Sequence, residues 1–463
     1  MTVEPSPLGG RIARRGASRP LYQQLAEALA EQLVAGNSGL PAARTLAARE
    51  GLNRATVNAA YRELARRGLT VIRRGRPRKG GTTQGVLGPA AEAEPPSGTF
   101  DLARYAPNRE LLPPGKVFRW LGLGQGEGET VAQYGSVWGY KSLRAWLASR
   151  LAARGLDSEV DRLLLTSGVQ HALDLLLRAV AHPGDAVLVE DPTYPGLPPL
   201  LSVHGVRAVG LTVREDGIDP DEVAAVLRRV RPRLAILTPT LHNPSGVVWD
   251  ETTRREVLDR LRAVSCLVVE ELFDPALVFA GPVPPPLAAL DRHVVAVGSF
   301  SKALFPGLRV GWLSGPREVV ESVAVVKRAT DLSGSPFLEA TAYHLCERGI
   351  LSEQLDRLRT LAQRRWTTVS ETLRVAQHSV RWSTPRGGFS TMLTLPPQRS
   401  SREVAARAAA EGVWVVPGPA MSVSGRDDVL RLAYAAVGVN QLKDAVQRLL
   451  RALEPTGIAS PLV

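Results

Sequence analysis

The sequence predicts an α/β protein in which a small basic helical module precedes a larger domain built on a mostly parallel sheet. Three observations predict this organisation. Positive charge is concentrated near the N-terminal end, a helix–turn–helix pattern lies in the same basic stretch, and short apolar runs alternate with amphipathic helical patterns from about residue 101 onward. At 463 residues, the chain has room for roughly two to four domains.

The formal charge of +12 is unevenly distributed along the chain. Residues 1–85 contain 15 Lys and Arg against 5 Asp and Glu, which accounts for +10 of the total. A basic module beside a nearly neutral body is typical of a protein that contacts nucleic acid at one end and does other work at the other. On charge alone, a solubilising basic tail is the alternative interpretation.

Composition places the chain among globular proteins, with 44% hydrophobic and 22% charged residues. The cysteines, Cys266 and Cys346, lack the spacing of metal ligands, so we expect buried thiols in a reducing compartment and neither a disulfide nor a metal site. There is no apolar run of signal-peptide type and no stretch suited to a membrane helix. We therefore expect a cytoplasmic protein without membrane attachment.

Residues 15–80 are predicted to form a winged helix–turn–helix domain. Residues 21–34 carry leucines four apart on one helical face, a short helix around Leu46 is broken at Gly51, and Asn53 can cap the next helix. The first turn of that second helix would enter the major groove, and the following LTVIRRGRPRK predicts a strand, a turn and a basic wing. The side chains expected to contact DNA are Arg44, Arg54, Thr56, Tyr61, Arg62, Arg74 and Arg76.

The pattern LPxxRxLA followed by RxTVxxAYxxLxxxG, at residues 40–68, resembles the winged helix of the GntR regulators. This resemblance implies binding to double-stranded operator DNA. The wing reads GRPRKGG where that family usually has GSGTFV, and its charge favours phosphate contacts. A three-helix bundle without a DNA role is the alternative. Residues 81–100, rich in Gly, Pro, Ala and Ser, are predicted to be a linker.

From residue 101 to 463 the predicted elements alternate between helix and strand. HALDLLLRAVAHPGD (171–185) has a helical period, and the short apolar runs at 186–192, 233–239, 266–271 and 293–300 predict buried strands. Such runs separated by helices favour a mostly parallel sheet with helices on both faces. Because ligands bind at the carboxyl ends of the strands in such sheets, we looked there for reactive side chains.

Lys302 directly follows the predicted strand at 293–300. The chain has only six lysines beside 51 arginines, so a lysine at this place suggests chemistry that arginine cannot perform. An amine that loses its proton can form an imine with an aldehyde. A surface lysine at the start of a helix is the alternative interpretation.

The segment SFSKALFPGLRVGW (299–312) resembles the Schiff-base segment of the class I aminotransferases, which are fold type I pyridoxal 5'-phosphate (PLP) enzymes. TSGVQHAL (166–173), EDPTYPG (190–196), HNPSG (242–246) and VLRLAYAA (429–436) resemble further segments of the same family, in the same order. The resemblance implies that residues 101–463 form a fold type I PLP domain that ends in a smaller α+β subdomain and also mediates dimerisation.

The resemblance also implies a role for each matching residue. Lys302 would form the Schiff base, Tyr194 would stack on the pyridine ring, and Asn243 would bond its phenolic oxygen. Arg431 would receive an effector carboxylate through a two-pronged hydrogen bond. The remaining residues implied to bind PLP are Val169, Gln170, Ser299, Ser301 and Arg309 around the phosphate, Glu271 at the pyridine nitrogen, and Tyr134 at the phosphate of the partner in a homodimer.

One segment departs from the family pattern. The family usually has EDDYD, where this chain has EELFD, so Glu271 replaces the Asp that pairs with the pyridine nitrogen and Phe273 replaces a Tyr. The carboxylate is therefore retained on a side chain one methylene longer, and the tyrosine hydroxyl is lost. We therefore expect PLP binding with weak or no transamination. A decayed site that binds no PLP is the alternative.

The order winged helix, linker, aminotransferase-like domain resembles the MocR subfamily of GntR regulators. This resemblance implies a PLP-dependent transcription regulator that senses PLP, or PLP joined to an amino acid or amine, with vitamin B6 synthesis or the use of an amine as candidate targets. Two alternatives stay open: a catalytically active aminotransferase with a vestigial basic extension, and a DNA-binding protein whose large domain serves only for dimerisation.

Overall fold

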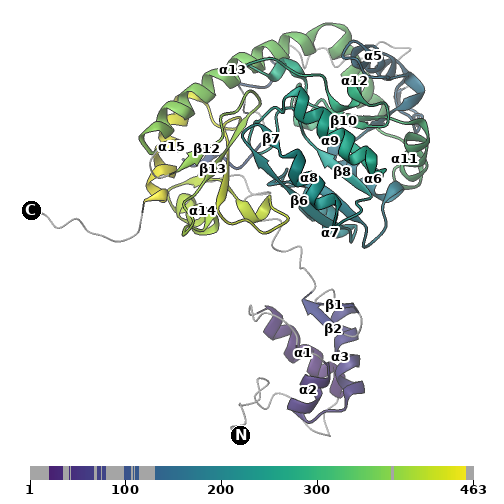
Figure 1. Cartoon of the computed structure of the whole chain (residues 1–463), viewed down its shortest axis with the longest axis vertical. Coiled ribbons are helices and arrows are strands. Elements are labelled where there is room, and N and C mark those ends of the chain that lie inside the picture. Colours follow the sequence, from purple (N-terminus) through teal and green to yellow (C-terminus); the bar gives the residue numbers. More distant parts are fainter. Residues whose placement is uncertain are drawn as a thin grey trace, which may run out of the picture. The chain divides into compact units, whose positions relative to one another are not determined.

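The structure is a computed structural model, and it describes residues 20–34, 41, 43–66, 70–73, 76–79, 98–105, 108, 110–113, 131–376 and 380–454. Residues 1–92 and 93–463 form two compact units, which are taken one at a time below (Figure 1). Most of the predicted linker, residues 81–97, lies outside the described residues.

The first unit is a three-helix module followed by a hairpin. The apolar faces of the helices meet in one core, where Leu25, Leu29 and Leu46 are buried. Asn53 accepts a hydrogen bond from the Ala55 N–H at 2.9 Å, which confirms its role at the start of the third helix. The elements are α1 (Leu21–Val34), α2 (Ala43–Glu50), α3 (Arg54–Arg66) and the antiparallel strands β1 (Thr70–Arg73) and β2 (Arg76–Lys79).

The second unit is built on an eight-stranded sheet in the order β4-β11-β10-β9-β8-β5-β6-β7. Its strands are β4 (Leu163–Thr166), β5 (Ala186–Asp191), β6 (Arg207–Arg214), β7 (Gly217–Ile218), β8 (Leu234–Leu237), β9 (Leu267–Glu271), β10 (Val295–Ser299) and β11 (Gly311–Ser314). Within this sheet, β11 and β7 run against the others, because each pairs antiparallel with its neighbours. The predicted mostly parallel sheet is therefore confirmed, and the carboxyl ends of the remaining strands meet at one edge.

Successive residues of each strand enter different cores, as the pleat requires. On β10, Val295 and Val297 pack into one cluster and Ala296 into the other. The first cluster also receives α6 (Val169–Val180), α7 (Leu197–Val203) and α11 (Arg317–Thr330). The second receives α5 (Lys141–Ala152), α8 (Pro220–Leu227), α9 (Glu251–Ala263), α10 (Leu287–Leu290) and α12 (Pro336–Glu347). Helices thus cover both faces, as predicted.

A smaller α+β subdomain contains the C-terminal elements (Figure 1). Its antiparallel sheet has the order β12 (Arg381–Trp382), β13 (Ser390–Thr394), β16 (Val429–Ala433) and β15 (Val416–Pro417). It packs with the 24-residue helix α13 (Ile350–Leu373), α14 (Ser401–Ala410) and α15 (Val439–Leu453). The strand β3 (Phe100–Asp101) joins this unit by pairing with β14 (Val413–Trp414).

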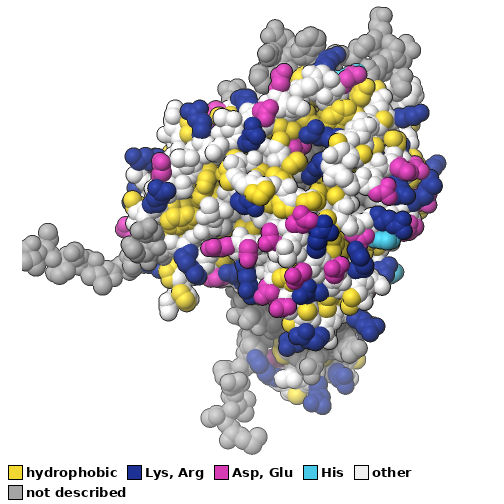
Figure 2. Space-filling view, turned by 45° about the horizontal axis from the view of Figure 1, so that its top comes forward, with side chains coloured by type: hydrophobic (Ala, Val, Ile, Leu, Met, Phe, Trp, Pro, Cys, Tyr) yellow, Lys and Arg dark blue, Asp and Glu magenta, His cyan; other side chains and the backbone are white. Residues whose placement is uncertain are grey.

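Charged side chains of both signs are interspersed over the face of the larger unit seen in Figure 2, which agrees with its nearly balanced charge. Cys266 and Cys346 are both buried free thiols. In the part of the chain that is described, no helix is long and apolar enough to cross a membrane, and no group of three or more His, Cys, Asp or Glu could hold a metal ion.

Candidate functional site

The first unit presents a basic surface on α2 and α3. Arg44 on α2 and Arg54 and Arg62 on α3 are exposed, and Thr56 in the first turn of α3 is half-buried. Contact of these side chains with DNA stays a prediction. Arg74 lies outside the described residues, and of Arg76 only the backbone in β2 is described.

Tyr61 was predicted to contact DNA, and this prediction is wrong. Its side chain is only 2% exposed, and its hydroxyl donates to the Pro41 carbonyl at 2.7 Å. Burial raises the pKa of Tyr61 to about 12, so the hydroxyl stays protonated and keeps donating. Tyr61 therefore ties α3 to the start of α2 within the core of the module.

A cavity of about 240 Å³ lies at the carboxyl edge of the main sheet in the second unit. Strand ends supply its polar groups, as expected for a parallel sheet. Predicted site residues that line it are Val169, Gln170, Tyr194, Asn243, Glu271, Ser299, Ser301, Lys302 and Arg309. Residues from segments as far apart as 169 and 309 thus meet in one pocket, and this arrangement removes the interpretation of Lys302 as an isolated surface lysine.

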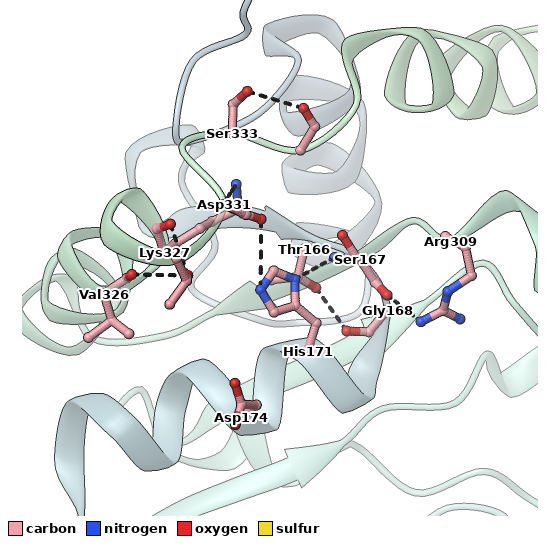
Figure 3. A network of polar contacts seen from close by, with 12 residues as sticks. Thr166, Ser167, Gly168, His171, Asp174, Arg309, Val326, Lys327, Asp331 and Ser333 are labelled. Carbon is pink, nitrogen blue, oxygen red and sulfur yellow. Dashed lines mark hydrogen bonds and ion pairs between the residues drawn. The ribbon is translucent and has the colours of Figure 1, made fainter.

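One end of the cavity is formed by the start of α6, which follows the Ser167–Gly168 turn (Figure 3). Gly168 has φ +100°, and a Cβ there would lie 2.8 Å from the Arg309 guanidinium, so this position requires glycine. Arg309 donates a hydrogen bond to the Ser167 carbonyl. A guanidinium and the unpaired N–H groups of a helix N-terminus therefore lie together, as in an anion site.

The middle of the cavity is walled by the ring of Tyr194. A Cβ at Gly196 would lie 2.5 Å from that ring, so a glycine is needed for the tyrosine to take this place. Gln170 donates to the Gly196 carbonyl at 3.1 Å, which connects the start of α6 to the loop that carries Tyr194. The pocket thus has a flat aromatic wall next to its anion site.

Lys302 lines the same cavity as Tyr194 and Glu271. Its amine donates to the Tyr105 carbonyl and lies 4.6 Å from the centroid of the Tyr105 ring. Burial, helped by the positive charge of Arg431, lowers the pKa of Lys302 to about 8. A substantial share of the amine is therefore neutral near physiological pH, as nucleophilic attack on an aldehyde requires.

Glu271 and Phe273 both line the cavity, one at the end of β9 and the other two residues further on. Burial raises the pKa of Glu271 to about 7, and the nearby Lys302 works in the opposite direction. The Phe273 side chain is buried and brings no polar atom to the cavity. Both replacements inferred from the EELFD segment therefore fall inside the pocket.

Arg431, on β16, lies beside the cavity and is only 4% exposed. Its guanidinium donates to the Ala103 carbonyl at 2.6 Å and to Asn243 Oδ1 at 3.3 Å, and it lies 5.5 Å from the centroid of the Tyr105 ring. Burial lowers the pKa of Arg431 to about 10, which still leaves it charged at neutral pH. One guanidinium nitrogen of Arg431 therefore contacts Asn243, which lines the cavity. Another is engaged by the backbone carbonyl of Ala103.

Tyr134 does not line this cavity, and its side chain is 89% exposed. The adjoining Gly135 lies against Pro336 at the start of α12, where a Cβ on Gly135 would come within 2.9 Å of the proline ring. A contact of Tyr134 with the site of a second chain stays a prediction.

Sequence reasoning missed two residues of the site. Tyr105 contacts both Lys302 and Arg431, yet it stands in a stretch without any motif, far from both in sequence. His171 accepts a hydrogen bond from the Ser167 N–H at 3.0 Å. His171 belongs to the TSGVQHAL segment and is the first residue of the predicted helix at 171–185, and a ring nitrogen near a helix start was the available signal.

Two families match this chain. Residues 109–449 match the family described as aminotransferase class I and II, and residues 17–78 match the bacterial regulatory proteins of the gntR family. A 2-aminoadipate transaminase from Thermus thermophilus is 32% identical over 335 residues, 71% of this chain and 83% of that protein. The HTH-type transcriptional regulator YisV from Bacillus subtilis is 28% identical over an alignment of 485 positions, which covers 94% of this chain and 96% of YisV.

The solved structures that resemble this chain include LysN, an alpha-aminoadipate aminotransferase from Thermus thermophilus complexed with N-(5'-phosphopyridoxyl)-L-leucine. Its TM-score is 0.73 at 29% identity, covering 80% of this chain and 97% of LysN. A Pyrococcus horikoshii kynurenine aminotransferase in complex with PMP has a TM-score of 0.74 at 26% identity, covering 80% and 93%. Both the predicted fold type and the predicted pairing of families are confirmed. The chain therefore belongs to the aminotransferase class I and II family, and its gntR-type region gives it the domain arrangement of the MocR subfamily.

Proposed function

We propose that the protein is a transcription regulator that binds operator DNA through its first unit and senses PLP, or PLP joined to an amino acid or amine, through its second. The observation that carries this proposal is the Lys302 amine in a pocket beside Tyr194, Asn243 and Arg309, in a chain that also has a gntR-type region. The full-length likeness to YisV, a protein named as a transcriptional regulator, supports it.

The pocket residues fit PLP at each of its functional groups. Arg309 and the N-terminus of α6 suit a phosphate, the Tyr194 ring suits a pyridine face, and Glu271 suits a ring nitrogen that carries a proton. When bound, PLP supplies an aldehyde that forms an imine with an amine, and a ring that withdraws electrons. The glycines at 168 and 196 keep open the approach of the backbone and the ring to this ligand.

Each side chain then has a definite task. Lys302 must give up a proton before its nitrogen attacks the aldehyde carbon, and its lowered pKa favours that step. Arg309 offsets phosphate charge, and Asn243, held by Arg431, presents its amide toward the phenolic oxygen. An ionised Glu271 would favour a proton on the pyridine nitrogen, although burial raises the pKa of its carboxyl in the pocket.

An aminotransferase activity is the second candidate, and the 32% identity to a transaminase favours it. Two features of the pocket favour weak or absent turnover. Glu271 carries its carboxyl on a longer side chain than the Asp of the family pattern, and Phe273 offers no hydroxyl. We therefore propose that the pocket serves sensing and that transamination is slow.

We further propose that the protein acts as a homodimer. Tyr134, Leu332 and Phe337 are large side chains left 89%, 59% and 44% exposed, and Gly135 lies against Pro336 in the same region. A second copy covering these side chains would remove apolar surface from water and bring Tyr134 of one protomer to the pocket of the other. Sedimentation of the wild type and of Phe337→Glu measures this; a wild type that stays monomeric at micromolar concentration contradicts it.

The test of the proposed function uses the full chain and genomic DNA of its source. Fragments that the wild type selects are assayed at one stated salt concentration, with and without PLP, against the wild type and Lys302→Ala. We expect PLP to change affinity or footprint in the wild type and to have no effect in the variant. Equal binding with and without PLP overturns PLP itself as the signal. Steady conversion of an amino acid and a 2-oxo acid at rates typical of enzymes would favour the aminotransferase instead.

A further inference from the structure

The start of α6 lacks the side chain that normally caps a helix. The N-cap residue is Gly168, which has no side-chain oxygen to accept from the first N–H groups. Three residues on, His171 turns its ring back toward the start of the helix, and Nδ1 accepts from the Ser167 N–H at 3.0 Å (Figure 3). Position N3 is where a Glu or Gln reaches back in a capping box. A histidine here makes a similar reach, one residue further back, with a ring nitrogen.

The charge of the side chain that accepts from Ser167 matters because the anion site lies beside it. A glutamate at this position would bring a negative charge to the anion site made by Arg309 and the α6 N-terminus. A neutral imidazole accepts the same N–H without that charge. Since Nδ1 is the acceptor, the ring proton is on Nε2, which lies 3.8 Å from Asp331 Oδ2.

His171 completes a set of bonds that hold the Ser167 residue at both its N–H and its carbonyl. The N–H of Ser167 is bound by His171 and its carbonyl by Arg309, while Thr166 Oγ1 donates to the Gly168 carbonyl at 3.1 Å. These bonds hold the turn that leads into α6, whose first residues, Val169 and Gln170, line the cavity together with Arg309. Removing the His171 acceptor leaves a partly buried N–H unpaired and frees the turn to rotate.

Burial keeps His171 neutral, and the charged groups around it act in both directions. Asp331, at the end of α11, is already paired with the fully buried Lys327 at 3.2 Å. Asp174, on α6 itself, is paired with His204 at 2.8 Å and with Arg178 at 2.9 Å. Burial lowers the pKa of His171; Lys327 and Arg309 add to this effect, while Asp331 and Asp174 oppose it. The acceptor lone pair on Nδ1 is therefore available at neutral pH.

We propose that His171 is a positioning residue for the phosphate of PLP: it acts through the Ser167 backbone, as a neutral acceptor, to align Arg309 and the α6 N–H groups on the phosphate. This inference rests on the proposed binding of PLP and assigns a role to a side chain that itself does not line the cavity. It also explains why the network in Figure 3 joins the anion site to α11.

The test compares PLP with pyridoxal, which has the aldehyde and no phosphate. Dissociation constants are measured from the imine absorbance, which needs no turnover, for the wild type, His171→Gln, His171→Leu and His171→Glu. We expect Gln, a neutral acceptor, to retain PLP affinity within about 3-fold. Leu should lose about 10-fold, because the Ser167 N–H is left unpaired. Glu should lose more than Leu, because its charge repels the phosphate. Pyridoxal affinity should change by less than about 2-fold throughout.

A second readout does not depend on Lys302. In the Lys302→Ala background, inorganic phosphate should raise the melting temperature with His171 present and do so less with Leu in its place. If the wild type forms no imine with PLP while this phosphate effect persists, the proposed function fails and the role of His171 stands. If His171→Leu weakens PLP and pyridoxal equally, or leaves both unchanged, the role of His171 is overturned.

The pH dependence of PLP binding provides an independent test of the role of His171. Protonated His171 has two donors and no acceptor, so it repels the Ser167 N–H. Below the lowered pKa of His171 we expect the PLP-to-pyridoxal affinity ratio of the wild type to fall, and above it the ratio to be constant. His171→Gln should lack this component, and because the phosphate of PLP titrates identically with both proteins, the difference between them isolates His171. Superimposable profiles would contradict the proposal.

Discussion

The two ends of the pocket are prepared for their ligands in different ways. At the end next to α6, backbone N–H groups and Arg309 are held by contacts that a ligand does not need to break. At the other end, Arg431 already donates to the Ala103 carbonyl and to Asn243, beside the ring of Tyr105. The first end is organised in advance to retain an anion. At the second, a carboxylate would compete with two partners that Arg431 already has.

Under the proposed function, this difference would separate retention of a cofactor from sensing of an effector. A carboxylate adds a charge–charge attraction to the guanidinium that the neutral Ala103 carbonyl lacks, so it can displace that carbonyl. The net gain in binding free energy is smaller than an arginine without partners would provide, because the bond to the Ala103 carbonyl is lost. We expect binding of an effector carboxylate to be weaker than binding of PLP and to disturb the Ala103–Tyr105 stretch.

The largest expected effect is at the residue between the two ends. Lys302→Ala should abolish the borohydride-sensitive imine absorbance, because no other amine lies in the pocket among its described lining residues. Lys141→Ala, at an exposed lysine, is the matched control and should retain full absorbance. An imine trapped in the Lys302→Ala protein and mapped by mass spectrometry to another lysine would refute the assignment.

At the phosphate end, Arg309→Gln should weaken PLP binding by about 10-fold to 100-fold, because a hydrogen bond to a charged group contributes about 1.5–3 kcal/mol. Pyridoxal binding should be nearly unchanged. Arg317→Gln, which alters an exposed arginine at the start of α11, controls for loss of general positive charge. Equal losses of PLP and pyridoxal affinity in Arg309→Gln would show that this end is not a phosphate site.

The cofactor end was largely predictable from sequence, and physical reasons explain why. Its residues stand at the ends of apolar strands or at a helix start, within short segments such as 299–302 and 242–246, and parallel strands bring their carboxyl ends to one edge. The helix–turn–helix was predictable for a similar reason: apolar spacing, Gly51 and Asn53 are local signals.

The effector end was predictable only in part, because Arg431 was predicted from its segment and Tyr105 was not. Tyr105 reaches Lys302 across a sequence separation of 197 residues, and no local periodicity encodes such a contact. Tyr61 shows the opposite failure. It was predicted to contact DNA, but packing of α3 on the rest of the module buries it and satisfies the hydroxyl internally. Both cases depend on tertiary packing rather than on spacing along the chain.

At the effector end, Arg431→Gln should leave PLP affinity within about 3-fold and reduce the response to carboxylate-bearing amines by about 10-fold. It should also increase hydrogen exchange of residues 98–105, because the bond to the Ala103 carbonyl is lost. Arg104→Gln, at an exposed side chain of the same stretch, is the control. Unchanged exchange in Arg431→Gln would mean that the arginine does not hold this stretch, and the contrast between the two ends would disappear.

The smallest expected effect is at Phe273, which distinguishes this pocket from the EDDYD pattern. Phe273→Tyr places a hydroxyl at the cavity wall, where the bound ligand would be its hydrogen-bond partner. One added hydrogen bond contributes about 0.5–1.5 kcal/mol to binding. PLP affinity should therefore rise by about 2-fold to 10-fold, with any transamination still limited by Glu271. Phe273→Leu, which removes the ring without adding a hydroxyl, controls for packing. A Tyr variant that binds PLP no better than the Leu variant would show that this wall does not face the phenolic oxygen.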